Sequence, residues 1–309
     1  FEFGWKLVAT DVFRPPSNPE WLAVLVGTGE QFLCMAVAIL GVALLGFFSP
    51  SNRGALMTSS FVFFALLGTV AGYSSSRIYK SFGGMQRKSV VLRTALFVPG
   101  IFFVVFFILD LCIWHEGSIG AVPIATFLII IALWFGISLP LVMLGAYFGF
   151  KSNEMEMPVK PTTIPRQLPD LPWYMHSAVM TAIGGAVVFA IIFVQVFFVF
   201  TKVWLNEFVY MFGFLFAVFV IMVVASAEVS IISVYLTLCS EDYRWWWKSF
   251  IVPTATGLYI FLLTLLYFAP SVPHSTTITV VILICYSGLM SLVSFCVRFN
   301  VRVCGPPGN

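Results

Sequence analysis

Long apolar runs follow one another along the chain, separated by short polar segments. A helix needs about 20 predominantly apolar residues to cross a membrane, whereas a barrel strand needs only about ten alternating ones. The pattern therefore predicts an all-α fold, a polytopic transmembrane helical bundle of about eight spans. The sixth run is long, and we expect it to tilt, kink or extend beyond the bilayer. The runs cover residues 21–48, 55–79, 90–114, 122–150, 177–200, 208–239, 250–268 and 276–299.

The composition supports the same class of protein. Of the 309 residues, 60% are hydrophobic and 9% are charged, whereas a soluble domain carries about 25% charged residues. So few charges cannot cover a water-facing surface, and the loops are too short to hold a soluble domain. The chain starts with Phe1 and has no signal-peptide pattern, so we expect a fragment or one part of a larger protein.

The basic residues lie almost entirely in alternate loops. Fourteen Lys and Arg side chains fall in one set of loops, and only Arg53 and Lys202 fall in the other. Short cytoplasmic loops are enriched in Lys and Arg, so the first set is predicted to be cytoplasmic, with both ends of the chain on that side. A missed or additional span would disturb the alternation, and the split therefore also supports the number of spans.

These features divide the chain into five segments. Residues 151–175 form a loop with five prolines, which cannot continue a helix and should run extended along the membrane. The other segments are a cytoplasmic N-terminal segment (1–20), the first four transmembrane helices (21–150), the last four (176–300) and a cytoplasmic tail (301–309).

Three carboxylates fall inside predicted spans: Glu30, Asp110 and Glu228. An acidic residue in a span costs a few kcal/mol and usually faces the bundle interior, so each is a functional candidate. Asp110 is near the lumenal end of its helix, where its side chain can reach the interface. Glu30 and Glu228 lie roughly 15 Å deep at 1.5 Å per residue. One hypothesis is that they line a shared polar cavity; the alternative is two unrelated protonated carboxyls, each satisfied by a neighbouring helix.

Glycines recur at helical spacing in two spans. Gly68 and Gly72 form one pair, and Gly145 and Gly149 form another. Small residues allow membrane helices to approach closely, and we interpret both pairs as internal packing of the bundle. Prolines at 99, 140 and 253 should kink their helices, and the fourth span should be the least regular.

No catalytic motif, metal-ligand spacing or cofactor motif occurs in the sequence. The six cysteines contain no CxxC pair and are interpreted as small buried hydrophobes. The histidines lie at helix ends or in loops, without partners at metal-ligand spacing. We therefore expect no catalytic residue, no metal, no cofactor and no nucleic-acid partner; the partners expected are the lipid bilayer and other membrane proteins.

One cytoplasmic loop carries an unusual motif. Glu241 and Asp242 can pair locally with Arg244 and Lys248, and the tryptophans are expected at the level of the lipid headgroups. We favour a structural anchor between the sixth and seventh spans over a ligand site. The motif consists of Glu241, Asp242, Tyr243, Arg244, Trp245, Trp246 and Trp247.

This loop, LCSEDYRWWWKSF, occurs together with GWKLVATDVFRPP (4–16), RIYKSFGG (77–84) and IPRQLPDLPWY (164–174). With these motifs the chain resembles the nonaspanins, the transmembrane 9 superfamily, from Gly4 to about Phe299. The resemblance implies that a lumenal domain and one further span precede this fragment. It also implies residence in Golgi and endosomal membranes and a role in sorting other membrane proteins, particularly those with glycine-rich spans.

Two departures from the family pattern stand out. Ala9 and Thr10 replace a common His-Gly pair. The chain ends RFNVRVCGPPGN, without the Lys-x-Asp-type signal that engages coat proteins, so we do not expect this form to bind a coat.

Two functions from different classes follow. The first is a non-enzymatic protein of the secretory and endosomal pathway that assists the sorting and membrane localisation of other transmembrane proteins. The alternative is a secondary transporter or channel that uses the buried carboxylates; no four-plus-four internal repeat supports it.

Overall fold

The computed structural model describes residues 8–47, 53–115, 122–153, 161–162, 164, 166–169, 172–204, 212–268 and 288. In these ranges every regular element is helical, and seven helices are long and apolar enough to cross a membrane. The predicted all-α transmembrane bundle is confirmed. The predicted eighth span at 276–299 and the C-terminal end lie outside the described residues.

The seven spans follow the order of the predicted apolar runs. Several of them consist of two elements, because a turn or a π-helical segment interrupts the helix. The elements are α1 (Pro19–Leu44), α2 (Arg53–Leu66), α3 (Gly68–Ser81), α4 (Arg87–His115), α5 (Ile124–Leu133), a π-helix (Trp134–Ser138), α6 (Leu139–Lys151), α7 (Ser177–Trp204), α8 (Phe212–Cys239), α9 (Trp245–Thr254), α10 (Thr256–Leu263) and a second π-helix (Thr264–Phe268).

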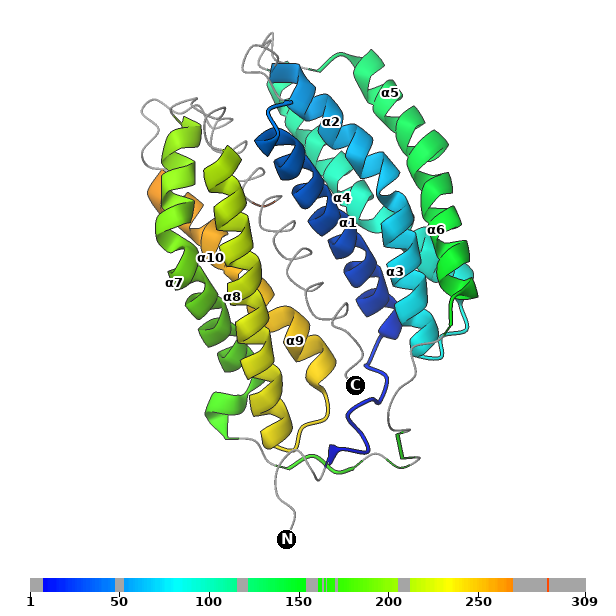
Figure 1. Ribbon diagram of the computed structural model, residues 1–309, viewed down its shortest axis with the longest axis vertical. Helices are drawn as coiled ribbons and strands as arrows, with labels where there is room; N and C mark the ends of the chain where they lie inside the picture. Colours follow the sequence, from blue (N-terminus) through cyan, green and yellow to red (C-terminus); the bar gives the residue numbers. More distant parts are fainter. Residues whose placement is uncertain are drawn as a thin grey trace.

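Successive spans run in opposite directions, so the charged loops gather at one end of the bundle (Figure 1). We call this the basic end; the starts of α1, α4, α7 and α9 and the ends of α3, α6 and α8 lie there. Arg53 at the start of α2 and Lys202 near the end of α7 lie at the opposite end. The helices therefore reproduce the separation of charges seen in the sequence.

Several helix ends shift by a few residues from the expected spans, and three differences stand out. The seventh span begins at Trp245, not at Phe250, because the tryptophans form the first turn of α9. The second span is interrupted at Leu67. The proline loop ends in a 3-10 turn, Trp173–Met175, after its last proline. The fourth span is irregular, as predicted: a π-helix separates α5 from α6, directly before Pro140.

The two glycine pairs pack α3 against α6, which confirms their interpretation as internal contacts. A Cβ on Gly72 would overlap the carbonyl oxygen of Val142, and one on Gly145 would overlap that of Thr69. Both obstructions are backbone atoms and cannot rotate away. Such close approach of backbones is how membrane helices associate without a hydrophobic driving force.

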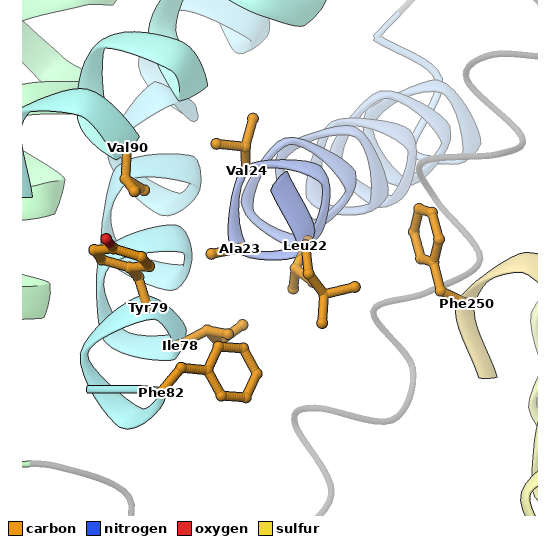
Figure 2. Close-up of a cluster of buried hydrophobic side chains, with 9 residues drawn as sticks. Leu22, Ala23, Val24, Ile78, Tyr79, Phe82, Val90 and Phe250 are labelled. Atoms are coloured by element: carbon orange, nitrogen blue, oxygen red, sulfur yellow. The ribbon is translucent and has the colours of Figure 1, made fainter. Parts of the chain in front are cut away.

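Buried side chains concentrate in the half of the bundle nearer the basic end. Figure 2 shows one cluster there, in which side chains of α1, α3, α4 and α9 meet around Leu22, Tyr79, Val90 and Phe250. Beyond Phe32, α1 buries only Ala43. The buried residues of α8 all lie between Ala225 and Thr237. In the fourth span α6 buries four residues and α5 none.

Candidate functional site

Three consecutive indoles bind the segment that precedes α1. Trp245 Nε1 donates to the carbonyl of Val12 (2.8 Å), Trp246 Nε1 to that of Arg14 (3.1 Å) and Trp247 Nε1 to that of Ser17 (2.6 Å). We call these three tryptophans and residues 12–17 the tryptophan clamp. It joins parts of the chain more than 200 residues apart and lies at the basic end of the bundle.

The local sequence on both sides explains why the clamp forms. Pro15 and Pro16 have no N–H and cannot continue a helix, so the segment stays irregular and its carbonyls remain available. On the other side, Trp245 and Trp246 stack with their ring centroids 4.1 Å apart, and Trp246 meets Phe82 of the α3 end edge-on. Half-buried indoles need a partner for their N–H, and the segment's carbonyls supply it.

The turn from α8 to α9 positions the tryptophans. Glu241 adopts a left-handed conformation (φ 60°), and the amides of Glu241 and Asp242 return to the carbonyls of Leu238 and Thr237. This is the Schellman ending of a helix, in which glycine usually occupies the left-handed position. Gly83 fills that position at the end of α3. Glu241 instead brings a charged side chain to the outside of the turn.

Asp242 holds the turn together from inside. Its side chain is fully buried and accepts hydrogen bonds from Lys248 Nζ (2.8 Å) and from the Arg244 amide and Nε (2.9 and 3.2 Å). Burial alone would raise the pKa of this carboxyl, but the hydrogen bonds from Lys248 and Arg244 outweigh it and lower the pKa below its ordinary value. Asp242 is therefore ionised, and its charge is balanced locally.

A second set of polar contacts ties the clamp to the proline loop. Asp11, also buried, accepts from Arg14 Nη2 (2.7 Å) and from the Thr162 hydroxyl (2.9 Å), while Arg14 also donates to the Thr162 carbonyl. Burial would raise the pKa of Asp11, but the hydrogen bonds from Arg14 and Thr162 reverse the shift and lower it. Arg166 pairs with Glu241 at 3.0 Å. The clamp thus connects the N-terminal segment, the proline loop and the start of α9.

The motif residues are brought together, with one change of partner. Asp242 pairs with Arg244 and Lys248, as local pairing predicted. Glu241, expected to pair locally, instead meets Arg166 in another loop. Tyr243 lies beneath the Arg14 guanidinium, 5.8 Å from its ring centroid. Sequence reasoning missed Val12, Arg14 and Ser17, because they contribute backbone carbonyls and no side-chain pattern identifies an acceptor carbonyl.

The three carboxylates inside the spans lie in different surroundings. Asp110 accepts a hydrogen bond from the Val122 amide (2.6 Å) and so ties the end of α4 to the start of the fourth span. Glu30 is half-buried on α1, at the level where the buried stretch of that helix ends. Glu228 is exposed, on the side of α8 away from the buried Ser226, Ser230 and Ser233. The shared cavity of Glu30 and Glu228 stays a prediction.

A further polar group lies where α1, α3 and α4 meet near the basic end. Arg93 pairs with Glu20, which also accepts a hydrogen bond from the Tyr79 hydroxyl (3.3 Å). The guanidinium lies 5.2 Å from the ring centroid of Trp21. The side chain of Arg93 remains 40% exposed, so this ion pair is only partly buried in the protein.

The contacts at these sites hold segments of the chain to one another. Among the described residues, no group of three His, Cys, Asp or Glu side chains is placed to hold a metal ion. The clamp consists of indole donors, backbone acceptors and balanced ion pairs. Such a set can hold chain segments in fixed positions, and it offers no activated nucleophile or proton donor at a cavity.

Comparison with known proteins places this arrangement in context. Residues 1–287 match the model of the family described as Endomembrane protein 70. Transmembrane 9 superfamily member 9 of Arabidopsis thaliana is 46% identical over 95% of this chain, and member 2 of Mus musculus is 46% identical over 95%. Member 4 of Homo sapiens is 43% identical over 94%. The chain spans 44–45% of the length of these relatives. No solved structure matches it.

Proposed function

The chain belongs to the transmembrane 9 superfamily, a family of multipass membrane proteins, and on that premise we propose that it assists the sorting and membrane localisation of other transmembrane proteins. In this role it is non-enzymatic and acts in Golgi and endosomal membranes, with the basic end of the bundle on the cytoplasmic side. Its clients are proteins with glycine-rich spans. Because the chain spans less than half of its relatives, the proposal concerns the contribution of this bundle.

The observation that carries the proposal is the unpacked half of the fourth span. We call α5 and the π-helix Trp134–Ser138 the open wall. No residue of α5 is buried, and Leu128 and Ile129 are more than 60% exposed. Phe127 meets Phe103 and Phe107 of α4 edge-on. The open wall therefore has one anchored side and one apolar side on which another helix can pack.

Gly136 makes this wall suitable for a closely packed helix. A Cβ at Gly136 would meet no atom of the described residues within 4 Å, whereas a Cβ at Gly145 of the same span would overlap the backbone of α3. The indole of Trp134 donates to the Ala95 carbonyl (3.1 Å) and fixes the π-helix on α4. Interrupted helices of this kind are frequent at functional sites. An exposed glycine on a fixed turn allows a second helix to approach the backbone.

The test uses the full-length protein and a reporter with a glycine-rich span. Gly136→Leu fills the open position, and we expect it to reduce delivery of the reporter to its membrane several-fold while leaving thermal stability unchanged. Gly41→Leu is the matched control, because a Cβ at Gly41 of α1 also meets nothing within 4 Å in the described part of the chain, but Gly41 lies in a regular helix. Unchanged delivery with Gly136→Leu, or an equal loss with Gly41→Leu, contradicts the proposal.

A further inference from the structure

A groove runs along one side of α4, next to Trp21 of α1, whose ring meets Phe97 of the groove lining edge-on. Its volume is about 550 Å³ and its described lining is almost wholly apolar. The lining repeats at helical spacing along the first half of α4: Leu92, Arg93, Leu96, Phe97, Gly100, Ile101, Val104 and Val105. The buried residues Val90, Thr94 and Val98 lie on the adjacent face of the helix.

The one charged residue of this lining stands at its basic end. Arg93 lines the groove and also contacts Glu20 and the ring of Trp21. A guanidinium has five N–H donors in a planar fork. With 40% of its side chain exposed, Arg93 can meet the Glu20 carboxylate and a second anion together. Arg87 and Lys88, both exposed in the first turn of α4, add positive charge roughly 8–9 Å nearer the basic end, at 1.5 Å per residue.

We infer that this groove binds an anionic glycerophospholipid, with an acyl chain along α4 from Leu96 to Val105 and the phosphate at Arg93. The lining extends over roughly 20 Å at 1.5 Å per residue, which suits one leaflet of a hydrocarbon core about 30 Å thick. Trp21 lies beside Arg93 at the depth where tryptophans mark the membrane interface. This inference does not depend on the proposed sorting role, because the open wall and the groove have no residue in common, although Gly100 of the groove neighbours Trp134 of the open wall.

Charge complementarity decides the class of lipid. Glu20 balances Arg93, and Arg87 and Lys88 leave a net positive charge at the basic end of α4, where the lipid headgroup would lie. Each Lys or Arg close to an anionic membrane surface contributes about 1 kcal/mol to attraction, which corresponds to a preference of roughly fivefold. A zwitterionic lipid such as phosphatidylcholine offers the same acyl chains and phosphate but no net negative charge, whereas phosphatidylserine adds a carboxylate that these cations can meet.

The test counts lipids that remain bound to the full-length protein in native mass spectrometry, after exchange with equimolar palmitoyl-oleoyl phosphatidylserine and phosphatidylcholine. We expect a preference for phosphatidylserine that Arg93→Gln lowers about fivefold. Gly100→Leu should reduce retention of both lipids, since among the described residues a Cβ there meets only Trp134 Cη2, at 3.8 Å, and the larger side chain would fill the groove.

Glu20→Gln separates lipid binding from a purely structural role of the ion pair. Removing this carboxylate leaves Arg93 without its competing anion, so retention of phosphatidylserine should stay the same or rise. If Glu20→Gln and Arg93→Gln lower retention equally, or if Arg93→Gln leaves the ratio of the two lipids unchanged, the inference is wrong. It is also wrong if a photocrosslinker at Phe97 captures a transmembrane peptide and no lipid.

Discussion

The half of the bundle near the basic end and the half beyond it are built from the same helices in different ways. Near the basic end, backbone contacts at Gly72 and Gly145, the cluster around Leu22 and the tryptophan clamp hold the spans together. Further along, α5 has no buried residue and α1 buries only Ala43 after Phe32. Apolar composition alone therefore places a helix in the membrane but does not determine whether it packs.

The fourth span contains this contrast within a single helix. The α6 part carries Gly145 and Gly149, which bring it against α3, while α5 carries mainly isoleucine and leucine around its circumference. Large side chains on every face gain nothing from leaving lipid for a neighbouring helix, because lipid tails are equally apolar. Small residues and hydrogen bonds decide which helix segments close together.

The strongest test of the contrast compares two glycines of this span. Gly145→Ala places a Cβ against the Thr69 carbonyl, and we expect it to lower the free energy of unfolding by about 3 kcal/mol. Gly136→Ala should change it by less than about 0.5 kcal/mol, since the position is open. Denaturation of both variants in mixed micelles measures the difference. Equal losses would show that the fourth span is packed along its whole length.

A second substitution tests whether ion pairing closes the basic end. Asp242→Asn removes the charge that Lys248 and Arg244 share, and it should cost about 2 kcal/mol because the carboxylate is fully buried. Glu241→Gln is the matched control: its pair with Arg166 is partly exposed and should contribute less than about 0.5 kcal/mol. If the two variants lose similar free energies of unfolding in the same denaturation assay, the buried ion pairs of Asp242 do not stabilise the basic end more than the exposed pair of Glu241 does.

The third test concerns the clamp itself. Trp246→Phe keeps an aromatic ring against Phe82 but loses the N–H that donates to the Arg14 carbonyl, and it should cost about 1 kcal/mol. Trp173→Phe serves as control, because Trp173 is 78% exposed. Proteolysis of the segment before α1 gives a second readout, and cleavage there should rise with Trp246→Phe alone. Faster cleavage in both variants would show that protection of this segment does not depend on the clamp.

The smallest effect is expected from pH. A carboxyl whose pKa is lowered on folding stabilises the fold at every pH above its unfolded value, and the contribution is lost as the pH falls through the lowered folded value. Asp11 and Asp242 both have lowered pKa values, against an ordinary value of 3.8. Tryptophan fluorescence should therefore stay constant from pH 7 to about 5 and change only in stronger acid. A transition near neutral pH would contradict these ion pairs.

Much of the fold could be predicted from the sequence, because the signals for it are local. Run length gave the seven spans that the structure describes, loop charge gave the basic end, and the glycines at 68, 72, 145 and 149 indicated internal packing, which the structure assigns to α3 and α6. The starts of spans were harder to predict where polar and aromatic interfacial residues lower the hydropathy of a helix end. Lys248 and the tryptophans interrupt the apolar run, so the predicted span began at Phe250, whereas α9 begins at Trp245.

The candidate site was only half predictable. The motif from Glu241 to Trp247 stood out, and pairing of Asp242 with its neighbours follows from their spacing. The partners of the tryptophans lie about 230 residues away and are backbone carbonyls, which carry no sequence pattern. The pair between Glu241 and Arg166 depends on how two loops meet, and this is fixed only once the helices are packed.

A photocrosslinking scan along the exposed side of the fourth span tests the two-part bundle most directly. The crosslinker is placed at Leu128, Ile137, Leu144 and Phe148, all exposed to about 50% or more, in the presence of the glycine-rich reporter. We predict strong crosslinks at Leu128 and Ile137, on the open wall, and weak ones at Leu144 and Phe148 on α6. Equal yields at all four positions, or the reverse order, would contradict a docking surface confined to the unpacked half.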